Sequence, residues 1–78
     1  MTETVIYTHK GVRYHLGYLH QTIINGRQKY VIIPSFEFKP PFAYPLRKGA
    51  LNRFYSVAST AIAAGKVIPK EGKNIYLL

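Results

Sequence analysis

Basic and aromatic side chains are the groups through which this chain could do chemistry. Eleven Lys and Arg residues stand against three Glu, giving a formal net charge of +8, and there are seven Tyr and four Phe. Such a surplus of positive charge favours an anionic partner, which could be nucleic acid, acidic lipid or an acidic protein surface. Alternatively, the charge only keeps a small protein in solution.

Groups that carry most enzyme mechanisms are scarce in the sequence. It has no Cys and no Asp, and its three glutamates, Glu3, Glu37 and Glu71, are far apart. Neither a thiol nucleophile nor a pair of convergent carboxylates is therefore expected. The glycine-rich phosphate-binding loops of nucleotide enzymes are also missing from the sequence. We expect a protein that is not an enzyme and that needs no cofactor.

The histidines are His9, His15 and His20. In the strand register that two-residue turns would give, His15 lies on the opposite sheet face from His9 and His20, so the three cannot ligate one ion. We expect no metal site, because a protein zinc site needs at least three convergent ligands.

Three strands are predicted in the first half of the chain, which is rich in β-branched and aromatic residues. Their expected bounds are Thr4–His9, Val12–Ile24 and Arg27–Ile33, the last ended by Pro34. Lys10-Gly11 and Asn25-Gly26 separate them, and such dipeptides favour two-residue turns with positive φ. Gly17 is a candidate bulge or bend in the long second strand.

Two-residue turns fix which residues lie opposite each other. Val5 is expected opposite Leu16, and Tyr18 opposite Ile33. One sheet face is then mainly apolar, with Val5, Tyr7, Val12, Tyr14, Leu16, Tyr18, Val31 and Ile33. The other face carries Ile6, Thr8, Arg13, His15, Leu19, Gln21, Gln28, Tyr30 and Ile32. Both hairpins place the apolar set on the same face, which favours a three-stranded meander.

One helix is predicted over Ala50–Ala64, where apolar residues recur at helical spacing. Gly65 is expected at the C′ position. The β signals at Val67-Ile68 and Ile75–Leu78 predict a short terminal hairpin or one closing strand. The expected fold is α+β: a three-stranded antiparallel meander, one helix on its apolar face and a C-terminal strand or short hairpin, in a single domain of residues 1–78.

Two groups of residues are candidates for binding. Arg13, His15, Gln28 and Tyr30 share the less apolar sheet face in the expected register, and such side chains contact bases and phosphates. The alternative is an ordinary solvated sheet face. Arg47, Lys48 and Arg53 surround the predicted start of the helix, where free N–H groups suit a phosphate or carboxylate. Alternatively, these are solvated cations that tolerate the helix dipole.

The stretch from Pro34 to Gly49 collects four aromatic residues and four prolines. Ser35–Phe38 is expected to prolong the third strand, which leaves residues 39–46 irregular. Phe42 and Tyr44 could stack on bases or anchor a partner. Alternatively, the aromatic residues close the core, and at least two of Phe36, Phe38, Phe42 and Tyr44 are expected to be buried.

The sequence favours a non-enzymatic module that binds DNA or RNA. The alternative is a small protein-binding or inhibitor protein, of the type found in viruses or mobile elements, that docks on an acidic partner. A third alternative is a structural subunit that forms a homodimer through its exposed β edge or its C-terminal strand. Without Cys, a signal peptide or an apolar run long enough to span a bilayer, we expect a cytoplasmic protein in a reducing compartment.

Overall fold

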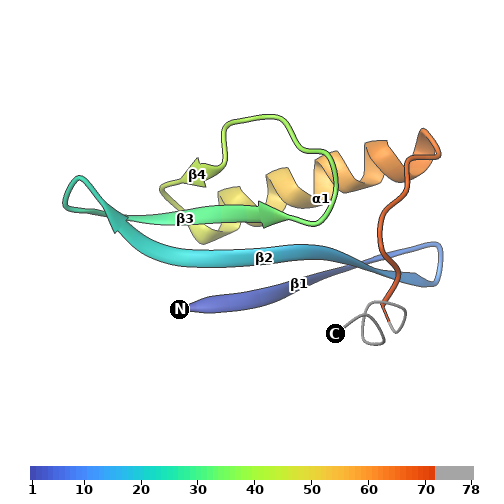
Figure 1. Cartoon of the computed structure of the whole chain (residues 1–78), viewed down its shortest axis with the longest axis horizontal. Coiled ribbons are helices and arrows are strands. Elements are labelled where there is room, and N and C mark those ends of the chain that lie inside the picture. Colours follow the sequence, from blue (N-terminus) through green and yellow to red (C-terminus); the bar gives the residue numbers. More distant parts are fainter. Residues whose placement is uncertain (72–78) are drawn as a thin grey trace.

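Residues 1–71, the part of the chain that the computed structural model describes, form one antiparallel sheet and one helix (Figure 1). The strands are β1 (Thr2–His9), β2 (Val12–Ile24), β3 (Arg27–Pro34) and β4 (Ala43–Tyr44), and the helix is α1 (Arg47–Ala63). The sheet order β1-β2-β3-β4 confirms the α+β meander with a single helix. The short strand β4, before the helix, is not predicted by the sequence patterns.

Both predicted turns are two residues long. Lys10 and Gly11 have φ values of 51° and 77°, and Asn25 and Gly26 have φ values of 54° and 75°. Positive φ at both central residues is the geometry of a type I′ turn, whose twist matches that of the flanking strands. The strands therefore start in the expected register, with Ile24 opposite Arg27 in the second hairpin.

The expected pairing of Val5 with Leu16 is wrong, because β2 carries one extra residue there. Val5 lies opposite Gly17 and Ile6 lies opposite His15, so Leu16 has no partner on β1. This is a β-bulge, in which two residues of one strand oppose one residue of its neighbour. Gly17 has a φ of +134°, which L side chains rarely adopt.

Ser35 closes the bulge from the end of β3. Its backbone N–H donates to the Leu16 carbonyl over 2.8 Å, and its hydroxyl donates to the His15 carbonyl over 2.8 Å. The chain turns away at this point, so β3 ends at Pro34 and the predicted extension through Phe38 is wrong. The bulge carbonyls thus keep hydrogen-bond partners although the ladder is interrupted.

The bulge reverses which side chains of β2 face the helix. Leu16 and Leu19 are only three residues apart, yet both are buried in the core, with 0% and 2% exposure. Tyr18 and its β3 partner Ile33 are 39% and 45% exposed. The expected assignment of β2 side chains to the two sheet faces is therefore correct before Gly17. After Gly17 it is inverted, both for β2 and for its partners on β3. An odd number of extra residues inverts the alternation of a strand.

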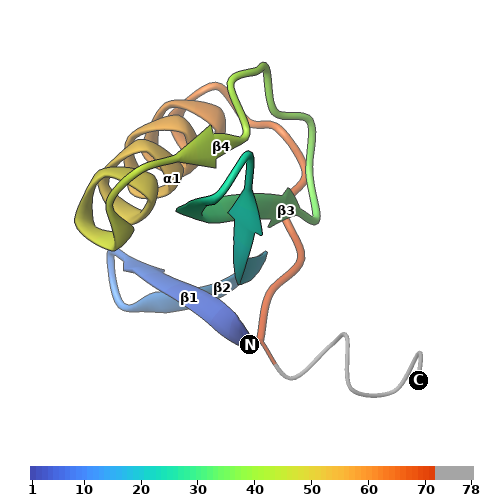
Figure 2. The ribbon, with the colours of Figure 1, turned by 90° about the vertical axis from the view of Figure 1, so that its left-hand side faces the viewer.

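The helix α1 packs on one face of the twisted sheet (Figure 2). Its buried residues are Ala50, Phe54, Ala58 and Ala61, so apolar residues at helical spacing face the sheet as predicted. Gly65 ends the helix as predicted. With a φ of 76°, it donates to the Ile62 carbonyl over 3.0 Å, while Lys66 donates to the Ala61 carbonyl over 2.9 Å. These two bonds form a Schellman motif.

After the helix, the chain runs back to the sheet and meets β2 (Figure 1). The His15 N–H donates to the Pro69 carbonyl over 2.8 Å, and the Glu71 N–H donates to the Arg13 carbonyl over 3.0 Å. This segment occupies the β2 edge that β3 leaves free beyond the bulge. The predicted strand at Val67-Ile68 is absent, and the contact of this segment with the sheet is a single bridge between Lys70 and Tyr14. The predicted strand Ile75–Leu78 lies outside the described residues.

Candidate functional site

The sheet has one face covered by α1 and one face that no helix of the described residues covers, here called the open face (Figure 2). After correction for the bulge, its residues alternate along β1, β2 and β3. They are Thr2, Thr4, Ile6, Thr8, Arg13, His15, Tyr18, His20, Thr22, Ile24, Arg27, Lys29, Val31 and Ile33. The exposure of Tyr18 and Ile33 at its centre shows that this face is accessible in residues 1–71.

Aromatic and imidazole rings lie together on the open face. The His15 ring packs edge-on against Tyr18, with centroids 5.3 Å apart. His20 lies two residues beyond Tyr18, and its Nδ1 is 2.7 Å from the Thr2 hydroxyl. The expectation that His15 and His20 lie on opposite faces is wrong. The bulge lies between them in β2 and inverts the alternation of side chains, so both residues lie on the open face. Residues 1–71 contain no group of three potential metal ligands.

The open face is basic. Arg13, Arg27 and Lys29 project from its strands, whereas none of the three glutamates does so in residues 1–71. Glu71 lies beside it and pairs with Arg13, with Nε and Oε2 2.6 Å apart. A face that combines cations with an exposed ring can contact both phosphates and bases.

The four residues predicted to share the binding face of the sheet lie on two different faces in the structure. Arg13 and His15 lie on the open face, but Gln28 and Tyr30 lie on the opposite face. Tyr30 packs against the core and pairs with Tyr44 of β4. The prediction that these four residues share one face is therefore wrong, and the bulge is the physical reason. The residues that take their place are Tyr18, His20, Arg27 and Lys29.

The cations predicted around the helix start do not form one cluster. α1 begins at Arg47, so Arg47 and Lys48 are in its first turn and not before it. Arg47 holds Glu3 of β1 through two bonds, Nε to Oε1 at 2.8 Å and Nη2 to Oε2 at 3.1 Å. These hydrogen bonds lower the pKa of Glu3. Arg47 is thus already paired, whereas Lys48 forms no ion pair with the rest of residues 1–71.

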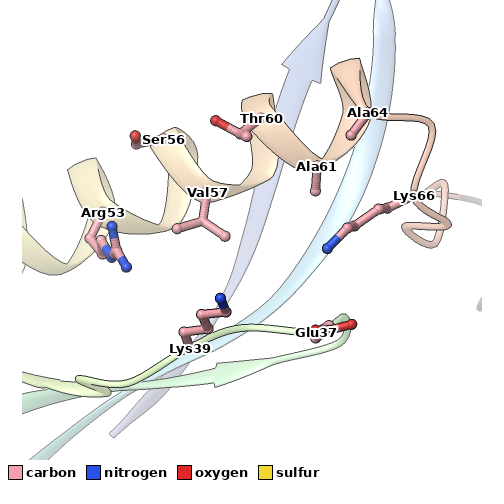
Figure 3. A pocket seen from close by; sticks show the side chains of 9 residues that line it. All are labelled: Glu37, Lys39, Arg53, Ser56, Val57, Thr60, Ala61, Ala64 and Lys66. Carbon is pink, nitrogen blue, oxygen red and sulfur yellow. The ribbon is translucent and has the colours of Figure 1, made fainter.

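The last predicted cation, Arg53, lies on another part of α1. Its guanidinium carbon is 5.7 Å from the centroid of the Phe38 ring, which is the geometry of a cation–π contact. Arg53 lines a pocket between α1 and the chain after β3 (Figure 3). Lys39 and Lys66 also line this pocket, and sequence reasoning gave no sign of their convergence because they come from two separate loops.

The aromatic loop residues mainly close the core. Phe38 is 9% exposed and meets Phe54 edge-on, while Phe36 and Tyr44 are half-buried. Phe42 is 37% exposed, and its ring lies 5.9 Å from that of Phe38. The expectation that at least two of these four rings are buried is wrong, because Phe38 is buried whereas Phe36 and Tyr44 are only partly buried against the core. The Tyr44 hydroxyl donates to the Pro41 carbonyl over 2.7 Å, so this polar group is engaged within the loop.

Comparison with protein-family models, with curated proteins and with solved structures found no match for this chain. Function must therefore be inferred from its own residues. In residues 1–71, no helix has the length and apolar character required to cross a membrane.

Proposed function

We propose that this protein is a non-enzymatic module that binds nucleic acid, DNA or RNA, through the open face. The observation that carries the proposal is the accessible sheet face that Tyr18 and His15 share with Arg13, Arg27 and Lys29, and no glutamate of residues 1–71 occupies a position on this face. Such binding implies a location inside the cell, which agrees with a sequence without Cys.

Each part of the open face matches one part of a nucleic-acid strand. The exposed Tyr18 ring offers a surface for a base, and stacking of this kind contributes about 1–3 kcal/mol per base. Arg27 and Lys29 lie on the strand adjacent to Tyr18, where they can reach phosphates. The apolar residues Val31 and Ile33 complete the surface between Lys29 and Tyr18. Exposed sheets carrying aromatic residues are a recurrent platform for single strands.

Fluorescence anisotropy tests this proposal on the full chain. Labelled single-stranded DNA, duplex DNA and single-stranded RNA are titrated with protein at several salt concentrations. Affinity should fall as salt rises, with a logarithmic slope of about −0.7 per phosphate contacted on a single strand and about −0.9 on a duplex. Absence of binding to all three at low salt would refute the proposal.

Two double variants with the same net charge separate the open face from charge in general. Arg27→Gln with Lys29→Gln removes two cations from the open face, whereas Lys39→Gln with Lys48→Gln removes two cations elsewhere. The first pair should weaken binding and reduce the salt slope by about 1.4 for a single strand. The second should have a much smaller effect. Equal losses would contradict a site on the open face.

The same surface supports an acidic protein partner as the second candidate function. Ile6, Val31 and Ile33 give the open face an apolar centre, which is typical of protein interfaces with polar rims. A partner captured from nuclease-treated extract, together with no binding to oligonucleotides, would favour this candidate. A second copy of the chain is distinguished from both by light scattering, which reports the mass in solution.

A further inference from the structure

A pocket of about 260 Å³ lies between α1 and the segment that follows β3, away from the open face (Figure 3). This volume is slightly below the range of about 300–1,000 Å³ usual for ligand sites, so it suits a small molecule. The residues that line it are Glu37, Lys39, Arg53, Ser56, Val57, Thr60, Ala61, Ala64 and Lys66.

Three cations converge on this pocket from separate parts of the chain. Lys39 belongs to the loop after β3, Arg53 to the middle of α1 and Lys66 to the turn after the helix. Figure 3 shows the Lys39 and Lys66 side chains directed into the space between the helix and the loop. None of the three forms an ion pair in residues 1–71, in contrast to Arg13 and Arg47.

Like charges that gather without a partner repel each other, and a bound anion removes this repulsion. Among residues 1–71, Glu37 is the only acidic residue of the lining, so the three cations exceed it by two charges. Arg53 is oriented by its contact with the Phe38 ring. An oriented guanidinium loses less conformational freedom when it binds an oxyanion.

The helix side of the pocket is apolar and made of small side chains. Val57, Ala61 and Ala64 recur at helical spacing and provide a surface for carbon atoms, while Ser56 and Thr60 add hydroxyl groups beside it. The Glu37 carboxylate can accept hydrogen bonds from ligand hydroxyls. The lining thus has two parts, a cationic part and a part suited to a hydroxylated carbon skeleton.

We propose that this pocket binds a small organic phosphate, a phosphomonoester on a hydroxylated skeleton. A phosphomonoester carries a charge of about −1.5 to −2 at neutral pH and three acceptor oxygens, which matches two excess charges and three cationic donors. A single carboxylate would leave one charge without a partner. Sugar phosphates and mononucleotides share this chemistry, and the pocket volume favours the smaller of them. The site is independent of the open face.

Amide chemical-shift titrations and calorimetry test this inference on the full chain. The ligands are inorganic phosphate, ribose 5-phosphate and AMP, with ribose as the uncharged control. Ribose 5-phosphate or AMP should bind more tightly than inorganic phosphate, with shifts concentrated around Lys39, Arg53 and Lys66, and ribose should not bind. Tighter binding of ribose 5-phosphate than of AMP would identify a sugar phosphate as the preferred ligand of the pocket.

Variants show whether the pocket itself is responsible. Lys39→Gln with Lys66→Gln should weaken phosphomonoester binding by about tenfold or more, because charge-assisted bonds are lost. Ala64→Leu should weaken phosphomonoester binding, because the larger side chain fills part of the pocket without changing any charge. Arg27→Gln with Lys29→Gln, on the open face, should leave phosphomonoester binding unchanged while reducing nucleic-acid affinity. Loss of binding at one site can therefore be told apart from loss at the other.

Three results would overturn the inference. These are absence of binding at millimolar phosphomonoester, equal binding of ribose, and unchanged affinity in the Lys39 and Lys66 double variant. Circular dichroism and thermal unfolding verify that each variant is folded, as expected because none of the substituted positions is buried.

Discussion

Gly17 lies directly against the backbone of Ile33: a Cβ at position 17 would be 2.1 Å from the Ile33 carbonyl oxygen. This close approach, together with the bulge at Leu16, lets β2 bury Leu16 and Leu19 on one side while Tyr18 points to the other. The open face therefore depends on one glycine. If β2 continued without the bulge, Tyr18 would lie under the helix and the cations of β3 would face another surface.

Substitution Gly17→Ala should destabilise the protein by about 3 kcal/mol, because it combines a strained φ with a backbone clash. Gly11→Ala is the matched control. Gly11 also has a positive φ, of +77°, but a Cβ at position 11 would have no neighbouring atom within 4 Å. It should cost only about 1–2 kcal/mol. Urea unfolding measures both, and equal losses would show that the approach of Ile33 is unimportant.

The Phe38 and Phe42 rings should differ in their contribution to stability. Phe38→Ala removes a ring that is 9% exposed and contacts Phe54, so it should cost about 3–4 kcal/mol. Phe42→Ala removes a ring that is 37% exposed and should cost clearly less. Thermal unfolding of both variants tests this ranking. A larger loss for Phe42 would mean that the loop packs differently from the arrangement described.

The ion pair of Glu3 with Arg47 predicts a pH-dependent effect of Glu3→Gln. Hydrogen bonds from Arg47 lower the pKa of Glu3 in the folded protein. A lowered folded pKa stabilises the protein above the unfolded pKa, and this stabilisation is lost as pH falls through the folded value. Glu3→Gln should therefore lower the unfolding temperature at neutral pH and have a diminishing effect towards strongly acidic pH.

Glu37→Gln is the control for that experiment, because Glu37 forms no ion pair in residues 1–71. Both substitutions remove one negative charge from a basic protein. The Glu3 variant should be the less stable of the two at neutral pH. The same stability for both, or a Glu3 effect that grows in acid, would contradict the assigned pair.

Tyr18 should contribute to nucleic-acid binding through its ring. Tyr18→Ala should weaken single-strand binding by about tenfold, since loss of one stacked base costs about 1–3 kcal/mol. Tyr18→Phe should retain most of the affinity because the ring remains. Anisotropy titrations compare the three proteins. Equal affinity of the Ala and Phe variants would exclude stacking on this ring.

Local sequence patterns are sufficient to predict the main elements of this fold. The Lys10-Gly11 and Asn25-Gly26 turns and the helix end at Gly65 are each predicted with their physical role, and each is present. These features depend on a few neighbouring residues, whose backbone preferences are strong. The strand β4 escapes prediction because two residues, Ala43-Tyr44, carry no periodic pattern.

The candidate site is predicted less well because it depends on long-range geometry. Gly17 is a candidate bulge from its residue type, but a register derived without the bulge inverts every face assignment beyond it. Arg47 is expected to be available for an anion, whereas Glu3 from the distant strand β1 already binds it. Pairing across 44 residues has no local signature in the sequence.

An amide chemical-shift map of the full chain, titrated with a short single-stranded oligonucleotide at low salt, tests nucleic-acid binding by the open face directly. We expect the largest changes at open-face positions around Tyr18, His20, Val31 and Ile33, with small changes along α1. Changes concentrated on α1, or no changes at all, would contradict the claim that the open face binds nucleic acid.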